Sequence, residues 1–182
     1  MTEQTPNTLR IIHYGHPSLR VKCAPVRDFN DDLRDLAEAM FRTMDANEGV
    51  GLAASQVDRL VRLLVVGVPV KDTEDEIRLA MVNPEILESS GSWDFEEGCL
   101  SIPDVRDTVS RTEFIKFRYQ DLDGKFHELE ATGLLGRVLL HEIDHLNGVL
   151  FTDYLSPVRR AIHSGTLKKL ARETAEQLEA EA

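Results

Sequence analysis

The chain has 182 residues, of which 42% are hydrophobic and 29% are charged, and its formal net charge is −11. This length is enough for one domain with a substantial core but short for two, so we expect a single domain over residues 1–182. The acidic balance argues against a general nucleic-acid binder, whose affinity depends on neutralising phosphates, and no apolar run approaches the ~20 residues that cross a bilayer.

The N-terminal part of the sequence predicts one amphipathic helix after a flexible start. Residues 1–10 are polar, without the apolar segment of a secretory signal, and we expect them to be flexible. Within 28–47 the apolar side chains recur at the spacing of one helical stripe. Asn30 or Asp31 is suited to cap the start of this helix, and Gly49 is suited to follow its end.

Four β-strands are predicted in the middle of the chain. The β-branched run 61–68 is typical of a buried strand, and 79–86 predicts a second strand that is interrupted at Pro84. Residues 112–120 and 125–131 flank an Asp-Gly pair, a combination typical of a β-hairpin. We expect these strands to pair mainly in antiparallel fashion.

Two further helices are predicted towards the C-terminus. Residues 134–147 read as a helix that is followed by Gly148. Ser156 and the proline after it provide a cap and a first position for a third helix, which extends over 157–182. A helix, a run of strands and then two helices, with no internal repeat or linker, indicate an α+β fold.

The predicted helix over 134–147 contains the segment HEIDHLNG. Positions i and i+4 lie on one face of a helix, so His141 and His145 can bind the same metal ion. Glu142 can reach a water on that ion, as in hydrolases with an HExxH motif. Asp144 either orients a ligand or points to solvent. The alternative is an ordinary helix whose histidines make hydrogen bonds, but the apolar flanks indicate burial, and buried histidines need partners.

A catalytic metal site of this kind needs a third protein ligand. By residue type the candidates are Cys99 and the four remaining histidines: His13, His16, His127 and His163. Cys99, in EEGCLS, is favoured because one thiolate and two imidazoles leave an open position for water. Its surroundings show no strong helical or strand pattern, and the alternative is a buried, inert thiol. We interpret Cys23 as an ordinary half-buried residue, and two cysteines in all fit a reducing compartment.

The segment EGVGLAASQV, residues 48–57, is rich in small residues. Small residues let a backbone approach a ligand or another element closely, and the segment lacks the glycine patterns of nucleotide-binding loops. Gln56 is its one side chain that could donate a hydrogen bond to a developing oxyanion. The alternative is a helix end followed by a tightly packed turn.

Together these segments resemble the peptide deformylase family. Its signatures GxGLAAxQ, EGCLS and HExDHxxG stand here, complete and in that order, as GVGLAASQ at 49–56, EGCLS at 97–101 and HEIDHLNG at 141–148. The likeness covers most of the chain, from residue 10 to residue 160 approximately. It implies an α+β fold in which antiparallel sheets pack around a central helix carrying HExxH, with an N-terminal and a C-terminal helix.

The resemblance implies three metal ligands, a general acid/base, two oxyanion donors and two substrate contacts. In that order these are Cys99, His141 and His145; Glu142; Gln56 and the backbone N–H of Leu100; and Gly51 and Arg106. The implied reaction is removal of the formyl group from N-formyl-methionyl nascent peptides by a metal-bound hydroxide, which releases formate. The implied metal is iron, Fe2+, one per chain, for which Ni2+, Co2+ or Zn2+ can substitute. We therefore expect a cytoplasmic, bacterial enzyme with neither a membrane nor a sequence-specific nucleic acid as partner.

Two positions depart from the family pattern. Asp58 stands where the family usually has glycine, and Leu140 where it usually has glutamine. If residue 58 has a positive φ, aspartate is among the few residues that tolerate it. Leu140 would remove a hydrogen bond or a surface contact beside the first histidine. Neither position is a ligand, the base or an oxyanion donor.

The C-terminal segment 157–182 begins basic and ends acidic. The simpler interpretation is a solvated amphipathic helix. The resemblance adds a second interpretation, in which this helix contacts the ribosome near the exit tunnel, although its acidic end disfavours direct RNA binding.

Two other functions fit some of these features. A metallopeptidase of the HExxH type would cut internal peptide bonds, but a cysteine ligand and the GxGLAAxQ segment argue against it. A non-catalytic, ribosome-associated protein could keep the same fold, but the intact Glu142 and the complete ligand set argue against that.

Overall fold

The computed structural model describes residues 8–182, so most of the segment predicted to be flexible lies outside the described residues. In chain order, with η for 3-10 helices, the elements are η1 (Pro17–Arg20), α1 (Asp31–Ala46), β1 (Gly51–Ala53), η2 (Ala54–Val57), β2 (Leu63–Pro69), β3 (Glu76–Ser90), β4 (Trp93–Cys99), β5 (Ile102–Arg111), β6 (Phe114–Gln120), β7 (Phe126–Ala131), α2 (Gly133–Leu146), η3 (Phe151–Tyr154), α3 (Pro157–Ile162) and α4 (Ser164–Glu181). None of the described helices is long and apolar enough to cross a membrane.

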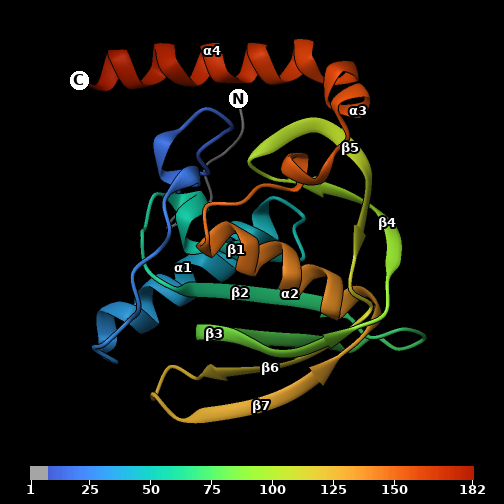
Figure 1. Ribbon diagram of the computed structural model, residues 1–182. Coiled ribbons are helices and arrows are strands. Elements are labelled where there is room, and N and C mark those ends of the chain that lie inside the picture. The colour runs from blue at the N-terminus through green and yellow to red at the C-terminus, as the bar shows by residue number, and fades with distance from the viewer. Residues whose placement is uncertain (1–7) are drawn as a thin grey trace.

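Two antiparallel sheets enclose the helix α2. One has five strands in the order β1-β2-β3-β6-β7, and the other is the β4–β5 hairpin. Strand β2 is apolar on both faces: Leu64 and Val66 share a core with α2, whereas Leu63 and Val65 share a core with α1. The predicted buried strand and the α+β class are therefore confirmed, with α2 and α1 on opposite faces of the larger sheet (Figure 1).

The predicted break at Pro84 is a bulge in the strand, not its end. Strand β3 runs on to Ser90, and its pairing with β6 shifts between Val82 and Glu85. The amide of Asn83, in a left-handed backbone conformation with φ 51°, bonds both backbone groups of Val26 at 2.9 Å. A proline lacks the N–H that a ladder needs, so a bulge accommodates it without ending the strand.

The β4–β5 hairpin was missed by the sequence pattern. Cys99, whose surroundings show no strong helical or strand pattern, is the last residue of β4. From Val105 onward the buried residues of β5 alternate regularly, but they are Val105, Asp107, Val109 and Arg111. Two of these four are charged, so the buried face of the strand does not read as an apolar one.

The predicted helix boundaries mostly hold. Asn30 accepts a hydrogen bond from the backbone N–H of Leu33 at 3.1 Å, and Gly148 follows α2 with φ +73°. Ser156 accepts from the backbone N–H of Arg159 at 3.3 Å, which confirms the predicted cap of the third helix. The C-terminal helix is not continuous, however, because it divides at His163 into α3 and the longer α4, which lies along the outside of the molecule (Figure 1).

Candidate active site

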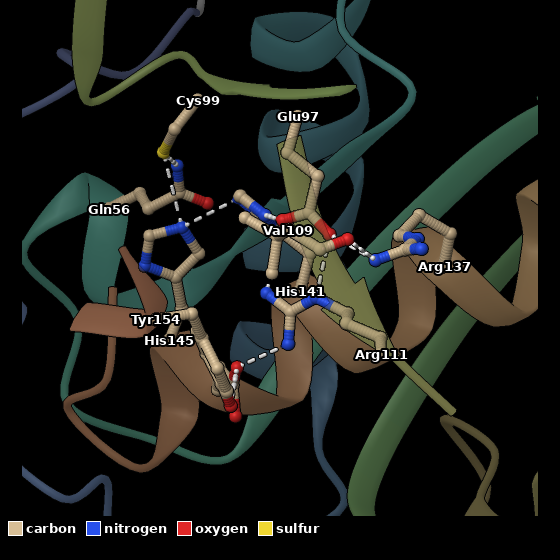
Figure 2. Close-up of polar contacts among 10 residues, drawn as sticks. Gln56, Glu97, Cys99, Val109, Arg111, Arg137, His141, His145 and Tyr154 are labelled. Atoms are coloured by element: carbon tan, nitrogen blue, oxygen red, sulfur yellow. Dashed lines mark hydrogen bonds and ion pairs between the residues drawn. The ribbon is translucent and has the colours of Figure 1, made fainter. Parts of the chain in front are cut away.

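Three candidate ligand atoms converge between α2 and the end of β4. His145 Nε2 lies 3.2 Å from Cys99 Sγ and 3.2 Å from His141 Nε2. All three atoms lie within 4.8 Å of one another, and no other such cluster of three occurs within residues 8–182. Figure 2 shows the thiol and the two imidazoles pointing towards one another. We call these three residues the ligand cluster.

The ligand cluster fits a divalent metal ion in distance and in chemistry. Tetrahedral ligands with metal–nitrogen bonds near 2.0 Å and a metal–sulfur bond near 2.3 Å lie about 3.3–3.6 Å apart, close to the distances found here. Two imidazoles and one thiolate suit several first-row divalent ions. The helix supplies the two imidazoles on one face and the hairpin supplies the thiol, so three of four tetrahedral positions come from the protein.

A buried chain of charged side chains holds the first histidine. His141 Nδ1 lies 2.9 Å from Glu97 Oε2, and Arg111 binds Glu97 through two nitrogens, at 2.6 and 3.0 Å. Arg111 also donates to Asp144 at 2.6 Å, and Tyr154 donates its hydroxyl to the same carboxylate oxygen at 2.8 Å. Asp144 therefore acts on the ligand His141 through two intermediates, Arg111 and Glu97, and does not point simply to solvent.

Glu97 fixes which nitrogen of His141 faces the ligand cluster. Burial alone would raise the pKa of Glu97, but its hydrogen bonds with His141 and Arg111 lower that pKa to about 2. The carboxylate is thus anionic at neutral pH and accepts the Nδ1 proton, which leaves Nε2 for a metal. Arg137 donates a further hydrogen bond to Glu97 at 3.0 Å.

Glu97, Arg111 and Arg137 are residues of the candidate site that the sequence reasoning missed. Glu97 stands inside the quoted EGCLS segment, two positions before Cys99, and this was the one available signal. Nothing local marks the two arginines, because their partners lie 14 to 44 residues away along the chain.

Glu142 is enclosed beside the ligand cluster. The residue is 4% exposed, and its Oε2 is buried without a hydrogen-bond partner among the described residues. Burial raises the pKa of Glu142 to about 7, with His141 opposing the rise and Glu97 adding to it. Gly51 lies directly against this carboxylate, since a Cβ there would stand 2.6 Å from Glu142 Oε1.

The predicted oxyanion and substrate residues line the same cavity. Its volume is about 990 Å³. Gln56 Nε2 lies 3.6 Å from Cys99 Sγ, and its Oε1 accepts from the backbone N–H of Ala53 at 2.9 Å, which fixes the amide orientation. The cavity is lined, among others, by Gly51, Gln56, Cys99, Leu100, Arg106, His141 and Glu142. Of the residues predicted for the site, only His145 is absent from this lining.

The other histidines are outside the ligand cluster, as predicted. His16 Nδ1 accepts from the backbone N–H of Ser18, and His127 pairs with Asp121. His13 and His163 also lie outside the ligand cluster. They line the cavity, however, and the sequence reasoning did not predict that position.

Cys23 is fully buried rather than half-buried, with 2% exposure, and burial raises the pKa of its thiol. A thiol that stays protonated and enclosed is a poor ligand and a poor nucleophile. Cys23 therefore belongs to the core between α2 and the sheet.

The two departures from the family pattern both have a place in the structure. Asp58 has φ 57°, as expected for a position where glycine is usual, and its carboxylate accepts from the hydroxyl of Ser18 at 2.5 Å. Leu140 is partly buried and packs against the core between α2 and the sheet. Leucine at position 140 therefore contributes apolar contacts to this core.

An α+β fold with a cysteine, two histidines and an enclosed glutamate on an HExxH helix defines a candidate metallohydrolase. Residues 8–161 match the family model for polypeptide deformylase. The chain therefore belongs to the polypeptide deformylase family, whose members are metal-dependent enzymes that act on nascent peptides.

Solved structures agree with this family. A peptide deformylase from Legionella pneumophila is 42% identical with a TM-score of 0.82, and the match covers 92% of this chain and 98% of that one. A plant peptide deformylase is 32% identical with a TM-score of 0.88, covering 97% and 95%. A class I type b peptide deformylase from Acinetobacter baumannii, with Met-Ala-Ser bound, is 39% identical with a TM-score of 0.75, covering 81% and 98%.

Proposed function

We propose that the protein hydrolyses the formyl amide of N-formyl-methionyl nascent peptides and releases formate. The observation that carries this proposal is the convergence of the ligand cluster and the enclosed carboxylate of Glu142 at one cavity. Family membership supports the same reaction. A cavity of about 990 Å³ also has room for several residues of an extended peptide.

Cys99, His141 and His145 would hold one divalent ion, and we propose Fe2+ as the native one, with Ni2+, Co2+ or Zn2+ as substitutes. When bound there, such an ion acts as a Lewis acid and makes water a usable nucleophile near neutral pH. A thiolate ligand donates more charge than a carboxylate would, and it also makes an iron site sensitive to oxygen.

The protein's own groups would move the protons and hold the developing charge. Water attacks the formyl carbon, a C–O bond forms, and the C–N bond to the methionine nitrogen then breaks. Glu142 takes a proton from the water and passes it to the leaving amine, a role supported by its buried Oε2, which has no hydrogen-bond partner among residues 8–182. Gln56 Nε2 and the backbone N–H of Leu100 would donate to the oxyanion.

Two further residues would bind the peptide. Gly51 lets the peptide backbone pass close to Glu142, since any side chain there would collide with that carboxylate. Arg106 lies on the cavity wall across the hairpin from Gly98, and its guanidinium would bind an acceptor of the substrate.

The test is formate release from formyl-Met-Ala-Ser by protein purified without oxygen, with bound metal measured on the same sample. Acetyl-Met-Ala-Ser and an internal-peptide substrate serve as controls. We expect formate from the formyl peptide alone and about one metal per chain, in line with one ligand cluster. Cleavage of the internal peptide would indicate a metallopeptidase, and metal without any turnover would indicate a binding protein.

We also propose that the outer face of α4 contacts the ribosome. The helix buries Leu167, Leu170 and Thr174, and its basic residues point outward: Lys168, Lys169 and Arg172. Truncation would uncover the core, so the sharper test is to replace these three cations together by glutamate and measure co-sedimentation with ribosomes. Unchanged co-sedimentation would refute the contact. We expect a modest affinity, because Glu173 pairs with Lys169 and Glu176 pairs with Arg172, which partly neutralises two of the three cations.

A further inference from the structure

Asp107 is a buried carboxylate outside the ligand cluster and its network. It lies on β5 and is 6% exposed. One of its oxygens accepts from Arg159 on α3, and the other lies 2.9 Å from Nε2 of His163, at the division between α3 and α4. The backbone N–H of Thr108 donates to it at 2.7 Å. A buried carboxylate needs such partners, and through them Asp107 links β5 to the C-terminal helices.

This contact joins two walls of the substrate cavity. One wall is formed by the start of β5, including Val105 and Arg106, and His163 contributes to another. Arg159 and His163 follow Asp107 by 52 and 56 positions in the sequence. The carboxylate therefore fixes the position of a side chain that local structure does not control.

The contact also sets the orientation of the imidazole. Burial acts to raise the pKa of Asp107, but the hydrogen bonds from His163, Thr108 and Arg159 lower it below its usual value. The carboxylate accepts, so Nε2 of His163 carries the proton, and Nδ1 is the remaining polar atom of the ring. Arg159 is half exposed, whereas the side chain of His163 is only 18% exposed.

We propose that Asp107 is a positioning residue for peptide binding, which holds His163 so that its imidazole contacts the peptide beyond the formyl-methionine. This inference rests on the proposed deformylase function. His163 lines the cavity and belongs neither to the ligand cluster nor to the groups assigned to the oxyanion and the proton transfer. The proposed contact is therefore with the bound peptide and not with the reacting carbonyl. Its effect belongs to KM, because an interaction equal in ground and transition states leaves kcat unchanged.

The experiment compares kcat and KM for formyl-Met-Ala-Ser among single and double variants of the metal-loaded enzyme. His163→Ala and Asp107→Ala should each raise KM about three- to tenfold, the effect of one hydrogen bond, with kcat within about twofold. Asp107→Asn keeps an acceptor for Nε2 and should recover most of the KM. The double variant should be no worse than either single one, because both remove the same contact.

Arg160→Ala is the matched control. Arg160 follows Arg159 on α3 but donates to the backbone carbonyls of Thr152 and Asp153, not to Asp107. Its KM should stay at the wild-type value. Additive effects in the double variant, a fall in kcat at constant KM, or an unchanged KM in His163→Ala would each overturn the proposal.

Further measurements distinguish a failure of this proposal from misfolding of a variant and from failure of the proposed function. If Asp107→Ala fails to fold, the comparison of His163→Ala with Arg160→Ala decides the matter. If the wild type releases no formate, the proposed function has failed, and calorimetric titration with formyl-Met-Ala-Ser then decides. A weaker Kd in His163→Ala supports the peptide contact, whereas an equal Kd or no binding overturns it.

Discussion

Helices α2 and α4 differ in how the fold treats their polar side chains. Of its 14 residues α2 buries nine, among them Arg137, His141, Glu142 and His145. Of its 18 residues α4 buries three, and its charged side chains lie in solvent. Buried polar groups destabilise a protein unless they are partnered. Most buried polar groups of α2 are therefore held by partners from other elements, with Glu142 Oε2 as an exception, whereas the exposed charge of α4 contributes little to stability.

The largest effect should come from removing a ligand of the cluster. Cys99→Ser should lose most of the bound metal and all measurable formate release, because a serine hydroxyl stays protonated at neutral pH and is a harder, weaker ligand. Metal per chain by mass spectrometry and formate release check this. The control is Cys23→Ala, which lies in the core and should keep its metal. Full metal content in Cys99→Ser would show that the thiolate is not a metal ligand.

Replacing Glu142, the proposed acid/base, should remove most of the turnover and spare the metal. Glu142→Gln keeps the shape of the side chain but cannot accept a proton, so kcat should fall by a factor of about 10² to 10⁴. Metal content and melting temperature should match the wild type. Glu130→Gln, on the exposed side of β7, is the control and should be fully active. Persistent turnover in Glu142→Gln would assign the proton transfer to another group.

Breaking the buried network should cost the protein much of its stability. Arg111→Met leaves Glu97 buried without the two hydrogen bonds that Arg111 donates to it, so the free energy of unfolding should fall by about 3–5 kcal/mol. Chemical denaturation measures this. The control is Arg118→Met, whose pair with Glu85 is exposed on both sides and should be worth at most about 1 kcal/mol. Equal losses in the two variants would contradict the contrast between buried and exposed charge.

Losing an apolar contact should lower the free energy of unfolding in both helices, and the two losses should differ less than those for polar contacts. Leu139→Ala in α2, with 0% exposure, should lower the free energy of unfolding by about 3–5 kcal/mol, and Leu167→Ala in α4, with 6% exposure, by about 2 kcal/mol. The same denaturation experiment measures both. A larger loss for Leu167→Ala would mean that α4 is part of the main folding unit.

The smallest effect should come from the exposed charge of α4. Lys169 stands 3.8 Å from Glu173 in an i,i+4 pair, with both side chains well exposed. Lys169→Ala should change the free energy of unfolding by no more than about 0.5 kcal/mol, and added salt should not increase the difference. A loss above about 1 kcal/mol would show that this surface pair is structurally important.

Features controlled by near neighbours in the chain could be predicted from the sequence. The cap at Asn30 and the shared helix face of His141 and His145 depend on residues three or four positions apart. The hairpin of β6 and β7 depends on a short turn with an Asp-Gly pair. The three family motifs add the proposed chemistry of the ligand cluster only because a known family carries them in the same order.

Contacts between distant residues were decided by the tertiary structure alone. Glu97 meets His141 across 44 positions, and Arg111 meets Asp144 across 33. The division of the last helix at His163 brings that side chain to Asp107, 56 positions earlier. Secondary-structure patterns record whether a residue is apolar, and these buried residues are charged. Their burial is stable only because folding delivers their partners, and no local pattern reports that.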